Sequence, residues 1–149
     1  MEKHDKCVYI MRGIPGSGKS TRARELAGSD GVVHSTDDFF VVDGEYVFDA
    51  SKLAWNHHQN YCEFVDSLRQ KIPVVVVDNT NSTLWEWQKY AASAVRFGYR
   101  VKVVEMPHID PVLAAQRNTH GVPEESIRRM LKRWDDKRPS YLADIDFID

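Results

Sequence analysis

Short apolar runs alternate with longer amphipathic segments along most of the chain. Four of the runs have the length and composition of buried strands, and they cover residues 7–12, 32–35, 74–77 and 101–106. The run 74–77 consists only of valine, which is typical of a central strand that is covered on both faces. The pattern therefore predicts a sheet whose strands are largely buried.

The segments between these runs carry apolar residues at helical spacing. We expect a long helix that begins at a cap on Asp49 and ends near Gln70, with Pro73 following it. Further helices are expected over residues 19–27, from about 82 to 97, over 112–117 and over 124–135.

Two segments depart from this alternation. Asp43 and Gly44 separate two short apolar runs, which is the strongest short-range signal for a β-hairpin. We expect this hairpin to lie outside the main sheet. The helical periodicity ends after residue 135, so residues 136–149 are expected to be irregular.

Strands that alternate with helices predict an α/β domain in three layers, with a central parallel sheet and right-handed crossovers. The length of 149 residues fits one domain, so we expect residues 1–149 to form a single domain. Apolar residues make up 42% of the chain and charged residues 28%, which excludes the composition of a disordered protein. The charged N-terminus lacks the features of a signal peptide, and no apolar run approaches the roughly 20 residues of a membrane span. We therefore expect no membrane partner and a cytoplasmic location, or a nuclear one in a eukaryote.

The net charge of -2 provides no overall attraction to nucleic acid. Basic residues nevertheless outnumber acidic ones between residues 117 and 138, which would allow a local basic patch. A solvated helix face with paired charges is the other interpretation of this region.

Residues 13–20 read Gly-Ile-Pro-Gly-Ser-Gly-Lys-Ser and match the phosphate-binding loop motif G-x-x-x-x-G-K-[ST]. The match lies between an expected strand and an expected helix, as this motif requires. Its glycines let backbone N–H groups converge on phosphate oxygens, and Lys19 can reach the β and γ phosphates. The nucleotide-binding residues expected from the motif are Gly13, Pro15, Gly16, Ser17, Gly18, Lys19, Ser20 and Thr21.

This motif predicts a nucleoside triphosphate donor, ATP or GTP, bound with Mg²⁺. Ser20 is an expected magnesium ligand, and Asp78, which closes the valine run, is expected to support the same ion. No Asn-Lys-x-Asp signature for guanine is present, so the identity of the base stays open.

Two aspartates occur where strands end, and ligands of open parallel sheets bind beyond the carboxyl ends of strands. Asp37 follows the second expected strand, at a place where an acceptor hydroxyl can approach. A carboxylate there can orient the hydroxyl and accept its proton, so Asp37 is the expected general base. Asp38 is the alternative, and Asp38, Phe39 and Arg128 are expected to contact the acceptor.

Residues 116–123 are expected to form a short lid over the phosphates. Arg117 is its main cation, and we expect it to bind the nucleotide and to neutralise the charge of the transferring group. Arg128 is a second candidate for this role, although an exposed arginine in a surface ion pair is an equal interpretation.

Together, the motifs of the chain resemble those of the P-loop polynucleotide 5'-hydroxyl kinases. The resemblance extends from about Tyr9 to Trp134 and is closest to the kinase modules of animal ubiquitin-ligase-binding proteins. It is more distant to bacteriophage polynucleotide kinase. The matching segments are residues 13–20, 35–39 (STDDF), 77–81 (VDNTN) and 117–121 (RNTHG).

The resemblance implies an adenylate-kinase-like fold with a short helical lid, and the 5' end of RNA or DNA as substrate. It carries over Lys19 and Ser20 for the donor, Asp37 as general base, Asp78 for magnesium and Arg117 as lid cation. The bacteriophage enzyme has a second lid arginine where this chain has Thr119 and His120. No protein partner is inferred from the resemblance or from the sequence.

Two other functions use the same motifs. A P-loop kinase with a small acceptor, such as a nucleoside, a sugar or an antibiotic hydroxyl, would need the same loop and the same aspartates. A binding module without catalysis would use the nucleotide to set its shape. The first differs in the acceptor alone, and the second would not need Asp37.

Overall fold

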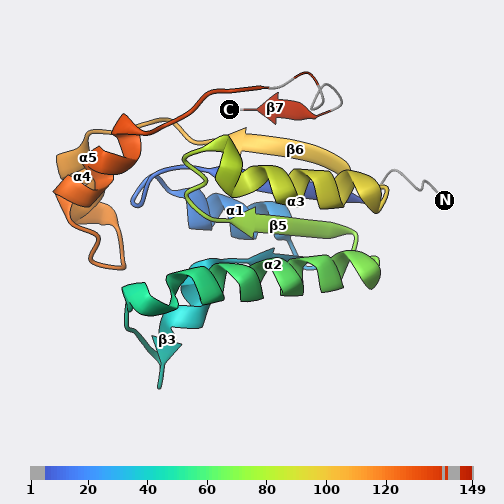
Figure 1. The fold of residues 1–149 in the computed structure, drawn as a ribbon, viewed down its shortest axis with the longest axis horizontal. Helices are drawn as coiled ribbons and strands as arrows, with labels where there is room; N and C mark the ends of the chain where they lie inside the picture. The colour runs from blue at the N-terminus through green and yellow to red at the C-terminus, as the bar shows by residue number, and fades with distance from the viewer. Residues whose placement is uncertain (1–5, 139, 141–144, 149) are drawn as a thin grey trace.

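A computed structural model describes residues 6–138, 140 and 145–148 of the chain. Its centre is a five-stranded sheet with the strand order β2-β5-β1-β6-β7, and every neighbouring pair is parallel (Figure 1). The strands are β1 (Cys7–Arg12), β2 (Gly31–His34), β5 (Val74–Asp78), β6 (Arg100–Glu105) and β7 (Asp146–Ile148). The predicted parallel α/β sheet is confirmed.

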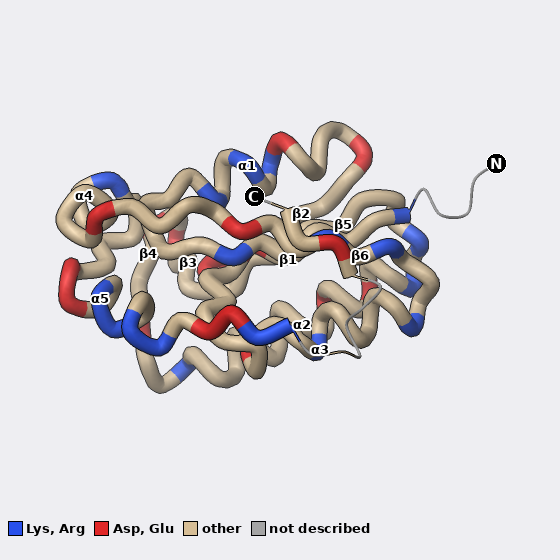
Figure 2. Tube along the Cα trace, turned by 90° about the horizontal axis from the view of Figure 1, so that it is seen from above, with Lys and Arg blue, Asp and Glu red and all other residues tan. Residues whose placement is uncertain are grey.

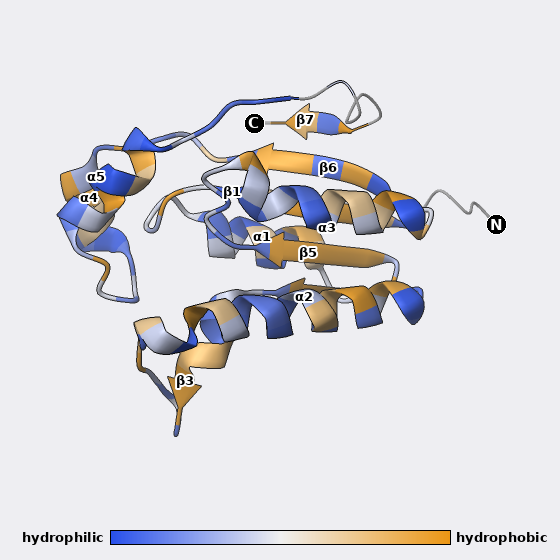
Figure 3. Ribbon diagram, in the orientation of Figure 1, coloured by the Kyte–Doolittle hydropathy of each residue, from blue (hydrophilic) through white to orange (hydrophobic). Residues whose placement is uncertain are grey.

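Helices cover both faces of the sheet and one of its ends. They are α1 (Lys19–Ala27), α2 (Leu53–Arg69), α3 (Leu84–Arg96), α4 (Pro111–Arg117) and α5 (Glu124–Lys132). The apolar sides of α2 and α3 pack on one face of the sheet, and α1 packs on the other. Figure 3 shows that β5 and most of β6 are hydrophobic, whereas the helices carry hydrophilic outer surfaces. None of the helices in the described residues combines the length and apolar character that crossing a bilayer would need.

The strand register brings the predicted motifs to one edge of the sheet. Met11 of β1 lies beside Asp78 of β5, and His34 of β2 lies beside Val77. The carboxyl ends of these three parallel strands therefore meet, and the loops that follow them form one surface.

The segment after β5 ties the neighbouring loops together. The side-chain oxygen of Asn79 accepts a hydrogen bond from the backbone N–H of Thr36 at 3.0 Å. The carbonyl of Thr80 accepts one from Gly13 N–H at 3.1 Å, and Asn81 donates to the carbonyl of Met11 at 2.8 Å. Residues 79–81 thus hold the start of the phosphate loop and the loop after β2 in fixed positions.

The predicted hairpin is present. Strands β3 (Val41–Val42) and β4 (Glu45–Tyr46) pair in antiparallel fashion outside the main sheet (Figure 1). Asp43 and Gly44 have φ angles of 51° and 83°, which is what a two-residue turn of type I′ requires. This hairpin follows the 3₁₀ helix η2 (Thr36–Phe40) and places Tyr46 beside Asp37.

The prediction that residues 136–149 are irregular was partly wrong. Strand β7 adds to β6 as a fifth strand, and Phe147 of β7 packs against the core formed by α3 and the sheet. The strand escapes pattern analysis because it has only three residues, an aspartate followed by Phe147 and Ile148, which is too short to show a period. Of the remaining tail, residues 139, 141–144 and 149 lie outside the described residues.

Three boundaries also differ from those expected. Helix α3 begins at Leu84 instead of near residue 82, because Thr83 and Glu86 form a capping box there. Helix α5 ends at Lys132 instead of near 135, and a 3₁₀ helix η3 (Ala50–Lys52), capped by Asp49, precedes α2.

The expected lid segment, residues 116–123, spans the end of α4 and the connection to α5. We call α4, this connection and α5 the lid, and the two helices lie at the end of the sheet near the phosphate loop (Figure 1). They pack on that loop through a small core of Ile14, Ala114 and Ile127. A Cβ on Gly16 would lie 2.5 Å from the carbonyl oxygen of Ala114, and the φ angle of Gly16 is +85°. Only glycine fits at this position, where the loop and α4 touch.

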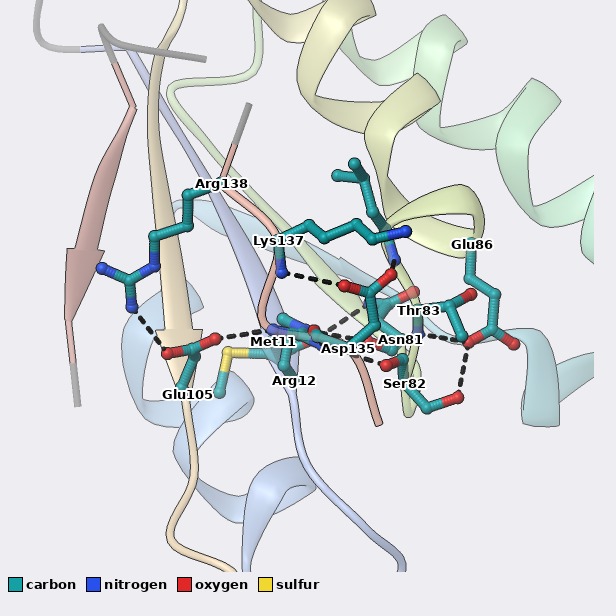
Figure 4. Close-up of polar contacts among 11 residues, drawn as sticks. Met11, Arg12, Asn81, Ser82, Thr83, Glu86, Glu105, Asp135, Lys137 and Arg138 are labelled. Atoms are coloured by element: carbon teal, nitrogen blue, oxygen red, sulfur yellow. Dashed lines mark hydrogen bonds and ion pairs between the residues drawn. The ribbon is translucent and has the colours of Figure 1, made fainter. Parts of the chain in front are cut away.

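Arg12, the last residue of β1, is a buried charge that joins three parts of the chain (Figure 4). Its Nη1 pairs with Glu105 Oε2 of β6 at 2.6 Å. Its Nε and Nη2 donate to the carbonyls of Asn81, Ser82 and Asp135 at 2.8, 3.1 and 2.6 Å. Because Asp135 follows α5, this network fixes the end of the lid to the strand that leads into the phosphate loop.

His34 provides a pH dependence of stability. Its ring is buried at the end of β2 and bonds Ser67 at 2.8 Å, and burial lowers its pKa below the ordinary value. The folded chain thus holds a neutral imidazole that the unfolded chain protonates below about pH 6.5. We expect the free energy of unfolding, measured by denaturant titration, to fall as the pH is lowered from 7.5 to 5. The variant His34→Gln should show a shallower fall, and an equal slope in both proteins would contradict this assignment.

Candidate active site

A cleft of about 1170 Å³ opens at the edge of the sheet where the predicted motifs meet. Its walls come from the phosphate loop, the loop after β2, the first turns of α2 and α3, and the lid. The lining residues with polar or aromatic side chains relevant to chemistry include Lys19, Ser20, Thr21, Arg24, Asp37, Tyr46, Trp85, Arg117, His120 and Arg133.

The phosphate loop presents an uncapped helix end to this cleft. Gly18 is the N-cap of α1 with φ 88°, and no side chain caps the helix there. The first turn of α1 carries no acidic residue, so its free N–H groups and its dipole favour an anion. The hydroxyl of Ser17 is buried and has no hydrogen-bond partner within the described part of the chain. The structure therefore offers donors of the kind that phosphate oxygens accept from.

Lys19 and Asp78 form an ion pair at the base of the cleft. The Nζ atom of Lys19 lies 2.9 Å from Oδ1 of Asp78, and the two side chains are 11% and 5% exposed. The motif and the strand end that the sequence analysis singled out separately are thus in direct contact.

Asp37 lines the cleft and is contacted by the hairpin and the lid. The Tyr46 hydroxyl donates to Asp37 Oδ1 at 3.4 Å, and His120 Nδ1 lies 3.2 Å from Asp37 Oδ2. The rings of Tyr46 and His120 stack with centroids 4.0 Å apart. Burial and the neighbouring Asp37 carboxylate raise the pKa of Tyr46 to about 12, so its hydroxyl keeps its proton at neutral pH. The contact of His120 with Asp37 was not predicted from the sequence, where His120 was noted only because the bacteriophage enzyme has a lid arginine in this region.

Asp38 and Phe39 lie beside the cleft but do not line it. Asp38 is an exposed residue, yet partial burial of its carboxyl, followed by the charges of Asp78 and Asp37, raises its pKa. The carbonyl of Phe39 accepts a hydrogen bond from Asn56 of α2 at 3.4 Å. Of the two adjacent aspartates, Asp37 is therefore the one that lines the cleft.

The arginines near the cleft differ in their surroundings. Arg117, at the end of α4, is exposed and lines the cleft, and within the described residues no ion pair engages it. Arg128 is engaged by Glu124 at 2.7 Å on the exposed face of α5 and is absent from the lining. Figure 2 shows that basic positions of α5 and the following segment are interleaved with acidic ones, as the paired-charge interpretation expects.

Three cationic lining residues were not expected from the sequence, namely Arg24, Arg133 and Lys89 of α3. Arg24 follows Thr21 by one turn on α1, so the helical spacing was a signal for its position. Arg133 donates to the Ser82 hydroxyl at 3.2 Å just after α5, and no local pattern indicated this contact across the fold.

The residues present fit a magnesium ion. Ser20 and Asp78 supply hydroxyl and carboxylate oxygens, which are the ligands this hard cation prefers. The described residues contain no cluster of three His, Cys, Asp or Glu side chains, so most ligands would come from phosphates and water. Magnesium commonly binds in this way in phosphoryl-transfer sites.

Comparison with known proteins identifies the family. The model of the family AAA_33, described as AAA domain, matches residues 8–137. Human NEDD4-binding protein 2 is 38% identical over 132 residues, which is 85% of this chain and 8% of that protein. Rat YLP motif-containing protein 1 is 24% identical, over 95% of this chain and 12% of that protein. The chain thus spans a small fraction of the curated relatives it matches.

Solved structures with a similar fold include one of an RNA repair complex and one of a protein in complex with ADP-AlF3. One is the structure of the Pnkp1/Rnl/Hen1 RNA repair complex, with a TM-score of 0.65, 20% identity, and coverage of 89% of this chain and 45% of that one. Another is Kti12 of Chaetomium thermophilum in complex with ADP-AlF3, with a TM-score of 0.63, 14% identity, and coverage of 95% and 88%. At sequence identities of 20% and 14%, these similarities show a shared fold and nothing about activity. Because the family model matches most of its length, the chain belongs to the AAA_33 family of P-loop kinases.

Proposed function

We propose that this chain transfers the γ-phosphate of ATP or GTP to the 5'-hydroxyl of RNA or DNA. The observation that carries the proposal is that one cleft holds both the phosphate loop, with its Lys19–Asp78 pair, and the carboxylate of Asp37. A donor and an acceptor bound there would meet between these groups.

On the donor side, the N–H groups at the start of α1 and the ammonium of Lys19 would hold the β and γ phosphates. Lys19 would then exchange its present partner Asp78 for phosphate oxygens, which are equally anionic. Asp78 and Ser20 would hold Mg²⁺, and this ion would neutralise charge on the phosphates when bound.

On the acceptor side, the 5'-hydroxyl oxygen would attack the γ phosphorus. The new bond forms between that oxygen and phosphorus while the bond between the β-γ bridging oxygen and phosphorus breaks. Asp37 would orient the hydroxyl and accept its proton. Because His120 occupies Oδ2 of Asp37 in this structure, the acceptor hydroxyl would replace the imidazole or bind at the other oxygen.

The lid would complete the site. Arg117 carries a charge that is free to meet the transferring group, whose negative charge is spread over three oxygens. Arg133 and Arg24 also line the cleft and are further cations available to the bound phosphates.

A polynucleotide acceptor is favoured over a small one by the sequence relationship. NEDD4-binding protein 2, which is 38% identical over 85% of this chain, is a polynucleotide kinase-like protein.

Asp37→Asn tests the acceptor side. We expect this variant to lower the rate of transfer to a 5'-hydroxyl oligonucleotide by about 10²- to 10⁴-fold, because asparagine cannot take up the proton. The rate would be measured with γ-labelled ATP or GTP under single-turnover conditions. Nucleotide affinity should stay within a few-fold of the original value.

Asp38→Asn is the matched control, since it makes the same change one residue away and outside the cleft lining. It should have a much smaller effect on transfer. Equal losses in both variants would refute the assignment of the base to Asp37. Nucleosides, sugars and an aminoglycoside are offered in the same assay, and label on one of these would indicate a small-acceptor kinase. Binding of the oligonucleotide without any transfer of label would indicate a nucleotide-dependent binding module.

A further inference from the structure

Trp85 is an exposed aromatic side chain in the wall of the cleft. It is the second residue of α3, and 80% of its surface is exposed, whereas Trp87 two positions later is fully buried in the core. The helix turns Trp87 toward the sheet, which leaves the indole of Trp85 facing the cleft that it lines. An indole so exposed contributes little to folding, and its aromatic face remains available to a ligand in the cleft.

The surroundings of Trp85 suit a base attached to a phosphate. Lys89 lies one turn further along α3 and lines the same cleft, and His58 lines it from α2. The acidic residue of this turn, Glu86, is already engaged, because it accepts hydrogen bonds from the Ser82 hydroxyl and Thr83 N–H at 2.7 and 3.0 Å. An aromatic face next to a cation is the combination by which single-stranded nucleic acid is held without sequence preference.

This wall is joined to the acceptor loop. The Thr36 hydroxyl, one residue before Asp37, bonds His57 Nδ1 of α2 at 2.9 Å. The backbone N–H of Thr36 is held by Asn79, in the segment that leads into α3. The position of Asp37 relative to the first turns of α2 and α3 is therefore fixed, and a chain that starts at Asp37 can follow this wall.

We propose that Trp85 is a stacking platform for a base of the acceptor strand, beyond the nucleotide whose 5'-hydroxyl meets Asp37. This inference rests on the proposed polynucleotide kinase function and names the feature by which the site selects a single strand over a mononucleotide. The remote base would lie on the indole, and Lys89 would meet the adjoining phosphate.

The test compares two acceptors: a single-stranded 5'-hydroxyl oligonucleotide of eight residues and a nucleoside 3'-phosphate. The measured quantity is the ratio of kcat/KM for the oligonucleotide to that for the mononucleotide. We expect Trp85→Ala to lower this ratio about tenfold or more, because the mononucleotide has no second base to stack. Trp85→Phe should retain most of the ratio, since it keeps an aromatic face.

Trp55→Ala is the matched control. Trp55 is 62% exposed on α2 but is absent from the cleft lining, so its removal should leave the ratio unchanged. If the original protein is active on both acceptors and the ratio is unchanged in Trp85→Ala, the stacking role of Trp85 is wrong, while the proposed kinase function stands. A raised KM for the donor nucleotide in that variant would assign Trp85 to the donor base instead. Transfer by the original protein to nucleosides or sugars but to no oligonucleotide would overturn both the platform and the proposed function.

Discussion

Lys19→Met is expected to lower phosphoryl transfer at least about 10³-fold, because it removes the positive charge that meets the β and γ phosphates. Methionine keeps the length and most of the hydrocarbon of the lysine side chain, so the packing around the phosphate loop changes little. The loss should appear in single-turnover transfer with saturating nucleotide. It should also appear as weaker nucleotide binding in calorimetry.

The ion pair with Asp78 requires a second variant. Lys19→Met leaves the 5% exposed carboxylate of Asp78 without its partner, and an unpaired buried charge destabilises a fold. In Lys19→Met/Asp78→Asn that charge is gone, so this double variant should recover stability while staying inactive. Lys132→Met on the exposed surface of α5 should be fully active. Turnover within tenfold of the original in a folded Lys19→Met protein would contradict the assignment of the phosphate loop.

Arg12→Met is expected to lower the free energy of unfolding by about 3 to 5 kcal/mol, the range for breaking a buried pair by removing one partner. The carbonyls of Asn81, Ser82 and Asp135 would lose their donor, and Glu105 would lose one of its two arginines. The loss is a large share of the roughly 5 to 15 kcal/mol that stabilise a typical domain. Denaturant unfolding followed by circular dichroism measures it.

Arg138→Met is the matched control for this prediction. Arg138 contacts the other oxygen of Glu105 at 3.0 Å, but its side chain is 54% exposed (Figure 4). A surface pair of this kind contributes about 0 to 1 kcal/mol. Similar effects of the two variants would mean that the buried network around Arg12 does not stabilise the fold as its geometry indicates.

The hydrogen bonds of Arg12 also connect the phosphate loop with the lid. Arg12 stands immediately before the phosphate loop, and Asp135 stands after the lid. A variant of Arg12 that remains folded should therefore bind nucleotide more weakly, because the root of the lid is no longer fixed to β1.

Much of the fold could be predicted because the signals are local. The valine run at 74–77 and the phosphate loop motif each determine an element and its neighbours within a few residues. Asp43 and Gly44 specify their turn in the same way, through the backbone angles that they tolerate. The position of Asp78 at the edge where the phosphate loop lies followed from a general property of parallel sheets, whereas its ion pair with Lys19 was not predicted.

The features that escaped prediction depend on contacts between distant segments. The lid contact of His120 with Asp37 spans more than eighty positions, and nothing near either residue signals it. In the sequence, Arg12 looks like an ordinary polar residue at the end of a strand. Its burial and its hydrogen bonds to distant carbonyls are visible only in the fold. Strand β7, with three residues, is too short to show a pattern, and it forms by pairing with β6.

The most direct test of the central claim uses two oligonucleotides of the same sequence, one with a 5'-hydroxyl and one with a 5'-phosphate. Each is incubated with the protein, Mg²⁺ and γ-labelled ATP or GTP. The proposed function predicts label on the 5'-hydroxyl strand, released as a labelled 5'-mononucleotide on nuclease digestion, and none on the 5'-phosphate strand. Label on neither strand, with transfer to nucleosides or sugars in the same preparation, would contradict it.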